Sequence, residues 1–226
     1  QYEIISNILR GRDSFCILPT GAGKSICYQI PALMFNGITI VISPLISLMK
    51  DQVDNLNSNG INARYINSTQ KLEVSDEIIE LCKKGEVKLL YIAPEKLENE
   101  FFKRKLRLLN ISQIAIDEAH CVSMWGHDFR KSYGLIAEFI DNLRIRPVVT
   151  AFTATATEVV RKDVINLLKL RNPYICIGSF DRENLEIKLY IEEDKLELVK
   201  DIIREREGES GIIYCATRKE VDGLYY

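Results

Sequence analysis

The fold is decided by one stretch of sequence, Leu18-Pro19-Thr20-Gly21-Ala22-Gly23-Lys24-Ser25. A short apolar run at residues 14–18 leads into it, and a segment with apolar residues at helical spacing follows at residues 25–34. A strand, a glycine-containing loop and a helix in this order point backbone N–H groups at a helix N-terminus, where a phosphate group binds favourably. The stretch therefore predicts a nucleotide phosphate loop.

Each residue type in this loop has a predicted role. Gly21 and Gly23 let N–H groups approach the phosphates, Lys24 reaches the outer phosphates, and Ser25 can ligate magnesium. The strict pattern would place a glycine at Leu18, so the match is to a looser form. The alternative is a glycine-rich turn that caps a helix and leaves Lys24 exposed. The predicted nucleotide-binding residues are Thr20, Gly21, Ala22, Gly23, Lys24 and Ser25.

Strand-like runs alternate with helical patterns along most of the chain, which is typical of βαβ units. Right-handed crossovers would place helices on both faces of a mostly parallel sheet, so the predicted fold class is α/β. The expected strands are residues 14–18, 38–43, 88–93, 113–117 and 147–152, and the expected helices are residues 25–34, 45–57, 74–84 and 158–168.

The alternation pauses at residues 171–173, before a strand-like run at 174–177, and we expect a domain boundary there. The first predicted domain is residues 1–172, and residues 173–226 are predicted to be a linker and the beginning of a second domain. The second domain should be an incomplete α/β unit, because few elements remain for it. Its expected elements are a strand at 187–191, a helix at 195–206 and a strand at 211–215.

A second chemical signal is an acidic pair at the end of an apolar strand, where Ile114-Ala115-Ile116 runs into Asp117-Glu118-Ala119-His120. Ligands gather at the carboxyl ends of parallel strands, so Asp117 could hold magnesium opposite Ser25. Glu118 would orient or deprotonate the attacking water, and His120 would couple the phosphates to the rest of the domain. The alternative for a lone acidic pair is a solvated helix start. The predicted catalytic residues are Lys24, Asp117, Glu118 and His120.

Composition limits the function classes. The 226 residues are 46% hydrophobic, enough for one sizeable core, and a net charge of −2 gives no overall attraction for nucleic acid. The six cysteines form no C-x-x-C pair, so we expect neither zinc nor a disulfide framework. No apolar run approaches the roughly 20 residues that span a bilayer, and no signal segment opens the chain. A cytoplasmic or nuclear protein is therefore expected.

The order of the motifs makes the chain resemble the RecQ family, DEAH-box helicases of superfamily 2, over nearly its whole length. The resemblance implies a RecA-like P-loop fold that uses ATP and Mg²⁺ for 3′ to 5′ movement on single-stranded DNA. It also implies unwinding of duplex DNA in repair and recombination. The segments that carry it are Gln1 with Ile4 and Ile5, then residues 18–25, 43–53, 93–97, 117–130, 152–156, 180–185 and 211–215.

The most specific segment is residues 119–130, here called the aromatic loop, which resembles the family loop that couples single-stranded DNA to ATP hydrolysis. Trp125 and Phe129 offer faces for bases to stack on, each worth roughly 1–3 kcal/mol, and Arg130 adds positive charge. The alternative is that both aromatic side chains pack in the core. The chain departs from the family at Met124, often polar there, and at Lys131 and Glu183, where prolines are common.

The resemblance assigns further contacts. Gln1 would read the adenine edge, since a carboxamide both donates and accepts hydrogen bonds, although a terminal glutamine without a role is the alternative. Segments at 43–50 and 94–95 would grip the DNA backbone, whereas Ser43 could instead cap a helix. The predicted DNA-binding and coupling residues are Ser43, Lys50, Pro94, Trp125, Phe129, Arg130, Thr153 and Thr155. Helical capping and the end of a strand remain alternatives for the hydroxyl residues, and Arg182 and Asn184 resemble interlobe contacts.

Two other classes of function stay open on the sequence. An RNA helicase or remodelling translocase would share the ATP-binding core, and a module that binds nucleic acid without catalysis would share the fold. In the family an arginine finger comes from the second lobe, and no segment here matches it. We expect the chain to be monomeric.

Residues 1–226 alone should therefore bind ATP weakly and hydrolyse it poorly, because the charge that the arginine finger places on the transition state is lacking. A steady-state ATPase assay with single-stranded DNA tests this expectation. Efficient DNA-stimulated turnover by these residues would contradict it.

Overall fold

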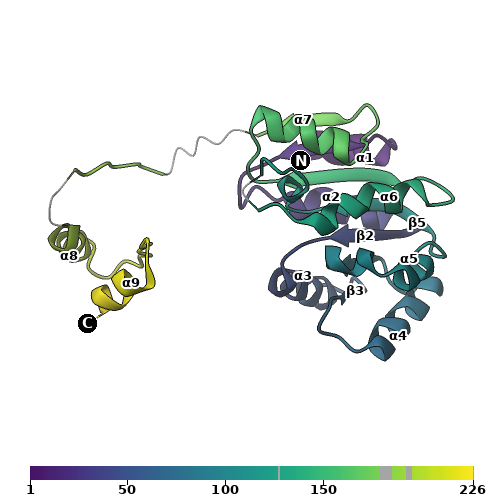
Figure 1. The fold of residues 1–226 in the computed structure, drawn as a ribbon, viewed down its shortest axis with the longest axis horizontal. Coiled ribbons are helices and arrows are strands. Elements are labelled where there is room, and N and C mark those ends of the chain that lie inside the picture. Colours follow the sequence, from purple (N-terminus) through teal and green to yellow (C-terminus); the bar gives the residue numbers. More distant parts are fainter. Residues whose placement is uncertain (127, 179–184, 192–194, 226) are drawn as a thin grey trace. The chain divides into compact units, whose positions relative to one another are not determined.

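A computed structural model describes residues 1–126, 128–178, 185–191 and 195–225. The chain divides into two compact units, residues 1–181 and residues 182–226 (Figure 1). The predicted boundary after residue 172 differs from this division, because strand β7 (Tyr174–Ile177) pairs with strand β1 (Ser14–Ile17) in the first unit. A run that reads as the start of the second unit is thus the edge of the first sheet.

In the described part of the chain, the first unit has one seven-stranded sheet with the order β3-β4-β2-β5-β6-β1-β7. Every neighbouring pair is parallel, as the alternation of strands and helices predicted. The other strands are β2 (Ile38–Ile42), β3 (Ala63–Ile66), β4 (Leu89–Ile92), β5 (Ile111–Ile116) and β6 (Val148–Thr153).

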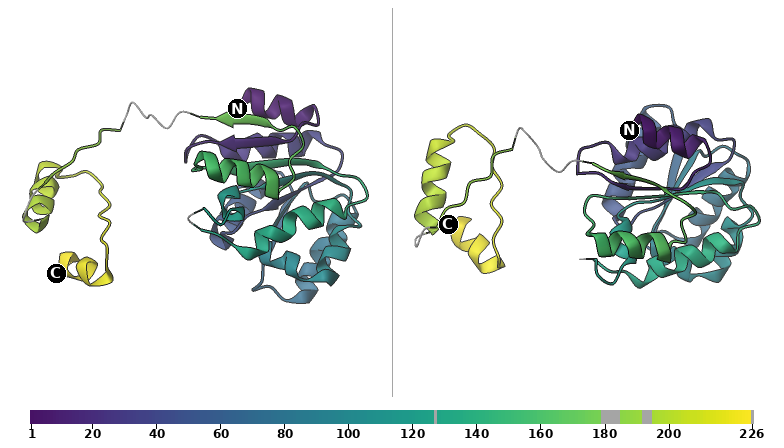
Figure 2. Two further views of the ribbon diagram at one scale, coloured as in Figure 1. Left: turned by 45° about the horizontal axis from the view of Figure 1, so that its top comes forward. Right: turned by 90° about the horizontal axis from the view of Figure 1, so that it is seen from above.

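Successive strand residues point to opposite faces of the sheet, and both faces are apolar. Phe15 and Ile17 of β1 join one buried cluster, whereas Cys16 joins the other. Figure 2 shows helices on both sides of the sheet. One face is covered by α1 (Tyr2–Leu9), α2 (Lys24–Met34) and α3 (Ile46–Ser58), and the other by α4 (Leu72–Lys83), α5 (Glu100–Leu106), α6 (Leu135–Asp141) and α7 (Glu158–Leu167).

The described part of the first unit also contains three short 3₁₀ helices. They are η1 (Pro94–Glu98) after β4, η2 (Ala119–Val122) after β5, and η3 (Lys131–Gly134) before α6. Within the described residues, no helix is long and apolar enough to cross a membrane.

The second unit contains α8 (Lys195–Glu205) and α9 (Arg218–Tyr225). The helix expected at 195–206 is confirmed. The prediction of strands at 187–191 and 211–215 is wrong, because both segments are irregular and largely exposed in the structure. A strand needs a neighbour for its backbone N–H and C=O groups, and none pairs with these segments in the described part of the unit.

At the amino ends of the strands, a buried carboxylate links distant parts of the first unit. Asp13 accepts hydrogen bonds from Nη1 and Nη2 of Arg146 at 3.1 and 2.6 Å, from the Val149 N–H at 2.9 Å, and from the Arg171 N–H at 2.7 Å. Because Asp13 is only 3% exposed, water cannot replace these bonds if the carboxylate is removed.

We therefore expect Asp13→Ala to lower the free energy of unfolding by about 3–5 kcal/mol, since it leaves Arg146 and two backbone N–H groups without their acceptor. Urea unfolding followed by circular dichroism measures this loss. Asp141→Ala is the control, because its ion pair with Lys169 is exposed, and it should cost less than about 1 kcal/mol. Equal losses in the two variants would refute the role of Asp13.

Candidate nucleotide site and nucleic-acid interface

The phosphate loop lies between β1 and α2, as predicted. Gly21 and Gly23 have φ angles of 83° and 77°, in the left-handed region that glycine adopts without strain, and Gly23 caps the N-terminus of α2. A side chain at Gly23 would also collide with the carboxamide of Gln1. The backbone conformation therefore favours glycine at position 23, and a side chain there would displace the carboxamide of Gln1.

Gln1 lies directly on the phosphate loop. Its Nε2 donates a hydrogen bond to the Ala22 carbonyl at 2.9 Å. This contact places the first residue of the chain beside the predicted nucleotide site, which is 21 positions away in the sequence. Adenine recognition by Gln1 stays a prediction.

Lys24 turns back toward its own loop. Its Nζ donates to the Leu18 carbonyl at 3.1 Å, and its charge partly opposes the rise in the Asp117 pKa that burial causes. The Lys24 ammonium therefore lies close to both the phosphate loop and the acidic pair. This position fits the outer phosphates of a nucleotide, the role predicted for Lys24.

Asp117 follows β5 and is nearly buried, with an exposed fraction of 9%. Its Oδ1 accepts from the Glu118 N–H at 3.0 Å, and its Oδ2 accepts from the Ser43 hydroxyl at 3.5 Å. Burial and then the neighbouring Glu118 charge raise the Asp117 pKa to about 6. A divalent cation relieves both effects, and oxygen donors such as Asp117 and Ser25 suit Mg²⁺.

A path of close polar contacts leads from the acidic pair to the next strand. Nδ1 of His120 lies 3.3 Å from Oε2 of Glu118 and 2.9 Å from the Thr153 hydroxyl. The Thr153 hydroxyl in turn donates to the Thr155 carbonyl at 3.0 Å and accepts from the Thr155 N–H at 3.2 Å. His120 and Thr153 are both buried, so the middle of this path lies inside the protein.

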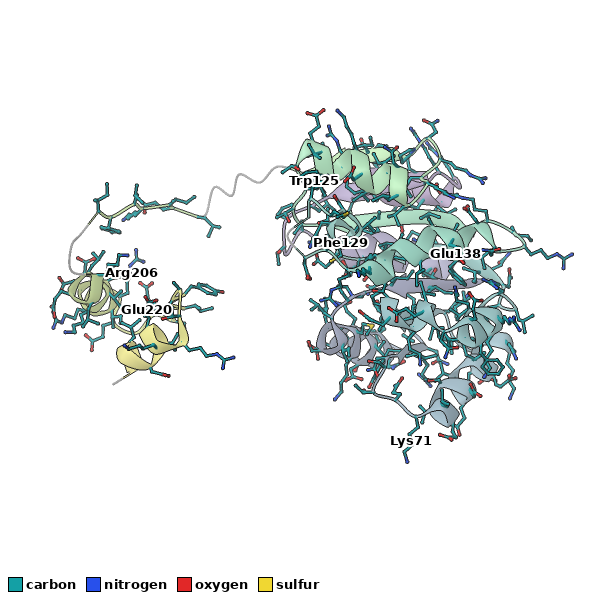
Figure 3. All side chains as sticks on the ribbon, in the orientation of Figure 1. Lys71, Trp125, Phe129, Glu138, Arg206 and Glu220 are labelled. Atoms are coloured by element: carbon teal, nitrogen blue, oxygen red, sulfur yellow. The ribbon has the colours of Figure 1, made fainter. Side chains whose placement is uncertain are left out.

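The aromatic loop begins with η2, and its two large aromatic side chains reach the surface of the first unit. Trp125 is 76% exposed and Phe129 is 42% exposed, and Figure 3 labels both side chains. Packing in the core is therefore excluded as the role of Trp125. His127, another residue of the loop, lies outside the described residues.

A cavity of about 370 Å³ lies between the aromatic loop and the start of α7. The buried His120 forms part of its lining, so the cavity adjoins the path from Glu118 to Thr155. Its lining residues are His120, Trp125, Gly126, Thr155, Ala156, Thr157 and Val160.

Arg130 joins three of the segments that were predicted to contact DNA. Its Nη1 donates to the Pro44 carbonyl at 3.3 Å and lies 3.7 Å from Glu95. Its Nη2 pairs with Asp128 at 3.3 Å. Arg130 therefore holds the segments after β2 and β4 against the aromatic loop.

The other predicted DNA contacts differ in exposure. Lys50 on α3 and Thr155 are exposed, whereas the side chains of Ser43, Pro94 and Thr153 are buried. Ser43 contacts Asp117, so in this conformation its hydroxyl belongs to the acidic site and not to the surface. Contact between these residues and DNA stays a prediction.

Two polar residues of the site were not predicted. The Tyr133 hydroxyl donates to the Asp117 carbonyl at 3.0 Å, and the Ser123 hydroxyl donates to Asp163 Oδ2 at 2.8 Å. No sequence pattern identifies either contact, because each joins a hydroxyl to a group that is distant in the sequence. The predicted interlobe residues Arg182 and Asn184 lie outside the described residues.

Among the described residues, no three His, Cys, Asp or Glu side chains gather as they would around a metal ion held by protein alone. A magnesium ion at Asp117 and Ser25 would take further ligands from the nucleotide phosphates and water.

The DEAD/DEAH box helicase family matches residues 1–163. Solved helicase structures share the fold at low identity. The DUF1998 helicase MrfA has a TM-score of 0.75 at 16% identity, over 99% of this chain and 36% of that one. The Hef helicase domain of Pyrococcus furiosus has a TM-score of 0.61 at 19% identity, over 77% and 37%. The fold and the family match thus place the chain in the class of DEAD/DEAH box helicases.

Comparison with individual relatives shows which family within the DEAD/DEAH box helicases the chain belongs to. The ATP-dependent DNA helicase RecQ of Bacillus subtilis is 49% identical over 100% of this chain and 38% of its own length. The Haemophilus influenzae RecQ is 46% identical over 99% and 36%, and the RecQ-like DNA helicase BLM of Xenopus laevis is 41% identical over 99% and 17%. The chain belongs to the RecQ family, as the order of its motifs predicted. It spans little more than a third of the two RecQ relatives.

Replacing Asp117 by Asn should stabilise the unliganded chain at neutral pH. The folded-state pKa of about 6 exceeds the ordinary 3.8, so the contribution of protonated Asp117 is complete below pH 3.8 and is lost as the pH rises through 6. Asparagine does not ionise and keeps that contribution. The difference in unfolding free energy between variant and wild type should grow over this range to about 3 kcal/mol.

Urea unfolding of both proteins from pH 4 to pH 8 measures the difference. A difference that does not vary with pH would contradict the proposed environment of Asp117.

Proposed function

We propose that the chain supplies the ATP-binding lobe of an ATP-dependent DNA helicase. In this proposal ATP hydrolysis drives 3′ to 5′ translocation on single-stranded DNA and unwinding of duplex DNA in repair or recombination. The protein would act as a monomer in the bacterial cytoplasm or, in a eukaryote, in the nucleus. The relatives named DNA helicases support this proposal, although the chain spans only part of each.

The observation that carries the proposal is the path from Glu118 through His120 to Thr153 and Thr155. One end of the path is at the acidic pair, where hydrolysis would occur. The other end is at the cavity beside Trp125, where a DNA base could stack. A protein that only binds nucleic acid has no need for such a connection.

The reaction would be attack of water on the γ-phosphorus of ATP, with cleavage of the bond to the β–γ bridging oxygen. Glu118 would orient the water and accept its proton, while Lys24 would stabilise negative charge on the outer phosphates. Asp117 and Ser25 would hold Mg²⁺, which neutralises phosphate charge when it is bound. Most of the rate enhancement would come from positioning and charge stabilisation.

Recognition of DNA would be independent of base sequence. Trp125 and Phe129 offer stacking surfaces, and Lys50 offers a cation to a phosphate. Stacking on aromatic rings tolerates every base, which suits a protein that moves along a strand.

Lys24→Ala should abolish nucleotide binding, and Glu118→Gln should preserve binding but reduce hydrolysis at least about a hundredfold, since the base that takes the proton is lost. Fluorescent ATP titration measures binding, and phosphate release from a version extended to the length of the RecQ relatives measures hydrolysis. Lys162→Ala, an exposed change on α7, is the control. Normal turnover in Glu118→Gln would remove Glu118 from this role.

The nature of the polynucleotide is tested with the same extended version. ATP turnover is compared without polynucleotide, with single-stranded DNA and with RNA. Stimulation by DNA alone is the expected result, because of the resemblance of the aromatic loop to the loop of RecQ proteins. Stimulation by RNA would move the protein to the RNA helicases, and no turnover in any condition would favour a binding module.

A further inference from the structure

A partly buried hydrogen bond fixes the base of the aromatic loop to α7. The Ser123 hydroxyl donates to Oδ2 of Asp163 at 2.8 Å, across 40 positions of sequence. Ser123 has no exposed surface, and Asp163 is half-buried on α7. A hydrogen bond to a carboxylate that is partly shielded from water contributes more than a fully exposed one.

Ser123 transmits this attachment to Trp125. The Trp125 N–H donates to the Ser123 hydroxyl at 3.2 Å, and the Gly126 N–H donates to the Ser123 carbonyl at 2.9 Å. The backbone that carries the exposed indole is therefore fixed by Ser123. The orientation of Trp125 depends on Asp163 through one intermediate residue.

The same turn rests on His120. The Ser123 N–H donates to the His120 carbonyl at 3.1 Å, and a Cβ on Gly126 would lie only 2.3 Å from that carbonyl oxygen. The turn that carries Trp125 is thus hydrogen-bonded to the backbone of His120, whose side chain contacts Glu118 and Thr153. The base of the aromatic loop cannot shift far without moving His120.

The helix that carries Asp163, α7, gives a second connection between Thr153 and Trp125. α7 begins at Glu158, a few residues after Thr153, and Thr157 caps it by accepting from the Val160 N–H at 3.3 Å. One route from Thr153 to Trp125 therefore runs through His120, and a second runs through α7, Asp163 and Ser123. Two attachments at different points restrict the turn more than one attachment does.

We propose that Asp163 is a positioning residue, which holds the aromatic loop through Ser123 so that DNA binding at Trp125 changes the position of His120. The coupling part of this inference rests on the proposed function. The mechanical part, that Asp163 orders Trp125, does not depend on DNA at all.

The mechanical part is tested in the 226-residue chain, in which Trp125 is the only tryptophan. Time-resolved fluorescence anisotropy of Asp163→Ala should show larger nanosecond motion of the indole than wild type. Asp163→Asn keeps an oxygen that can accept the Ser123 hydroxyl, so it should restore the wild-type decay. Glu158→Ala removes another acidic side chain from α7 and is the matched control.

The coupling part is tested in the version extended to the length of the RecQ relatives. Asp163→Ala should lower DNA-stimulated ATP turnover about tenfold, the effect of about 1.4 kcal/mol, and leave DNA-free turnover unchanged. Asp163→Asn and Glu158→Ala should behave as wild type.

Other outcomes overturn the inference in distinct ways. Equal anisotropy decays in Asp163→Ala and Glu158→Ala would show that Asp163 does not order the loop. Equal losses of DNA-free and DNA-stimulated turnover would show a general structural role. If wild type shows no stimulation by DNA, the proposed function fails, and the anisotropy measurement still decides whether Asp163 positions Trp125.

Discussion

All strands of the described sheet run in one direction, and this constraint brings the chemistry of the protein to one edge. The phosphate loop follows β1, Ser43 follows β2, Asp117 follows β5, and Thr153 ends β6. Because β2, β5, β6 and β1 are consecutive neighbours, groups that are distant in sequence meet at their carboxyl ends. The hydrogen bond between Ser43 and Asp117 joins residues 74 positions apart.

Bringing the acidic side chains together at the carboxyl ends of the strands has an electrostatic cost. Asp117 is buried beside Glu118, and both burial and the Glu118 charge raise its pKa, so its negative charge is unfavourable in the unliganded protein. The same arrangement favours a cation at this position, so the site is less stable than it could be and better suited to bind Mg²⁺ with a nucleotide. Strongly perturbed acids are often found at functional sites for this reason.

The aromatic loop combines an exposed tip with a buried base. Trp125 is accessible to a partner, while Ser123 beneath it is fully buried and hydrogen-bonded to α7. An exposed aromatic ring costs little conformational entropy on binding when its backbone is already fixed. In the proposed function, the exposed surface and the rigid attachment would together transmit contact at Trp125 to the buried His120.

The sequence by itself determined the features that depend on neighbouring residues. These are the phosphate loop, the apolar strands that alternate with helices, the acidic pair at the end of β5, and the helix at 195–206. Only the tertiary structure decided the rest. It placed β7 in the first sheet and revealed the short edge strand β3. It directed the Ser43 hydroxyl to Asp117 and paired Ser123 with Asp163. Within the described residues, it left the segments 187–191 and 211–215 without strand partners. Local patterns encode the preference of a segment for helix or strand, whereas pairing and hydrogen-bond partners depend on which distant segment arrives beside it.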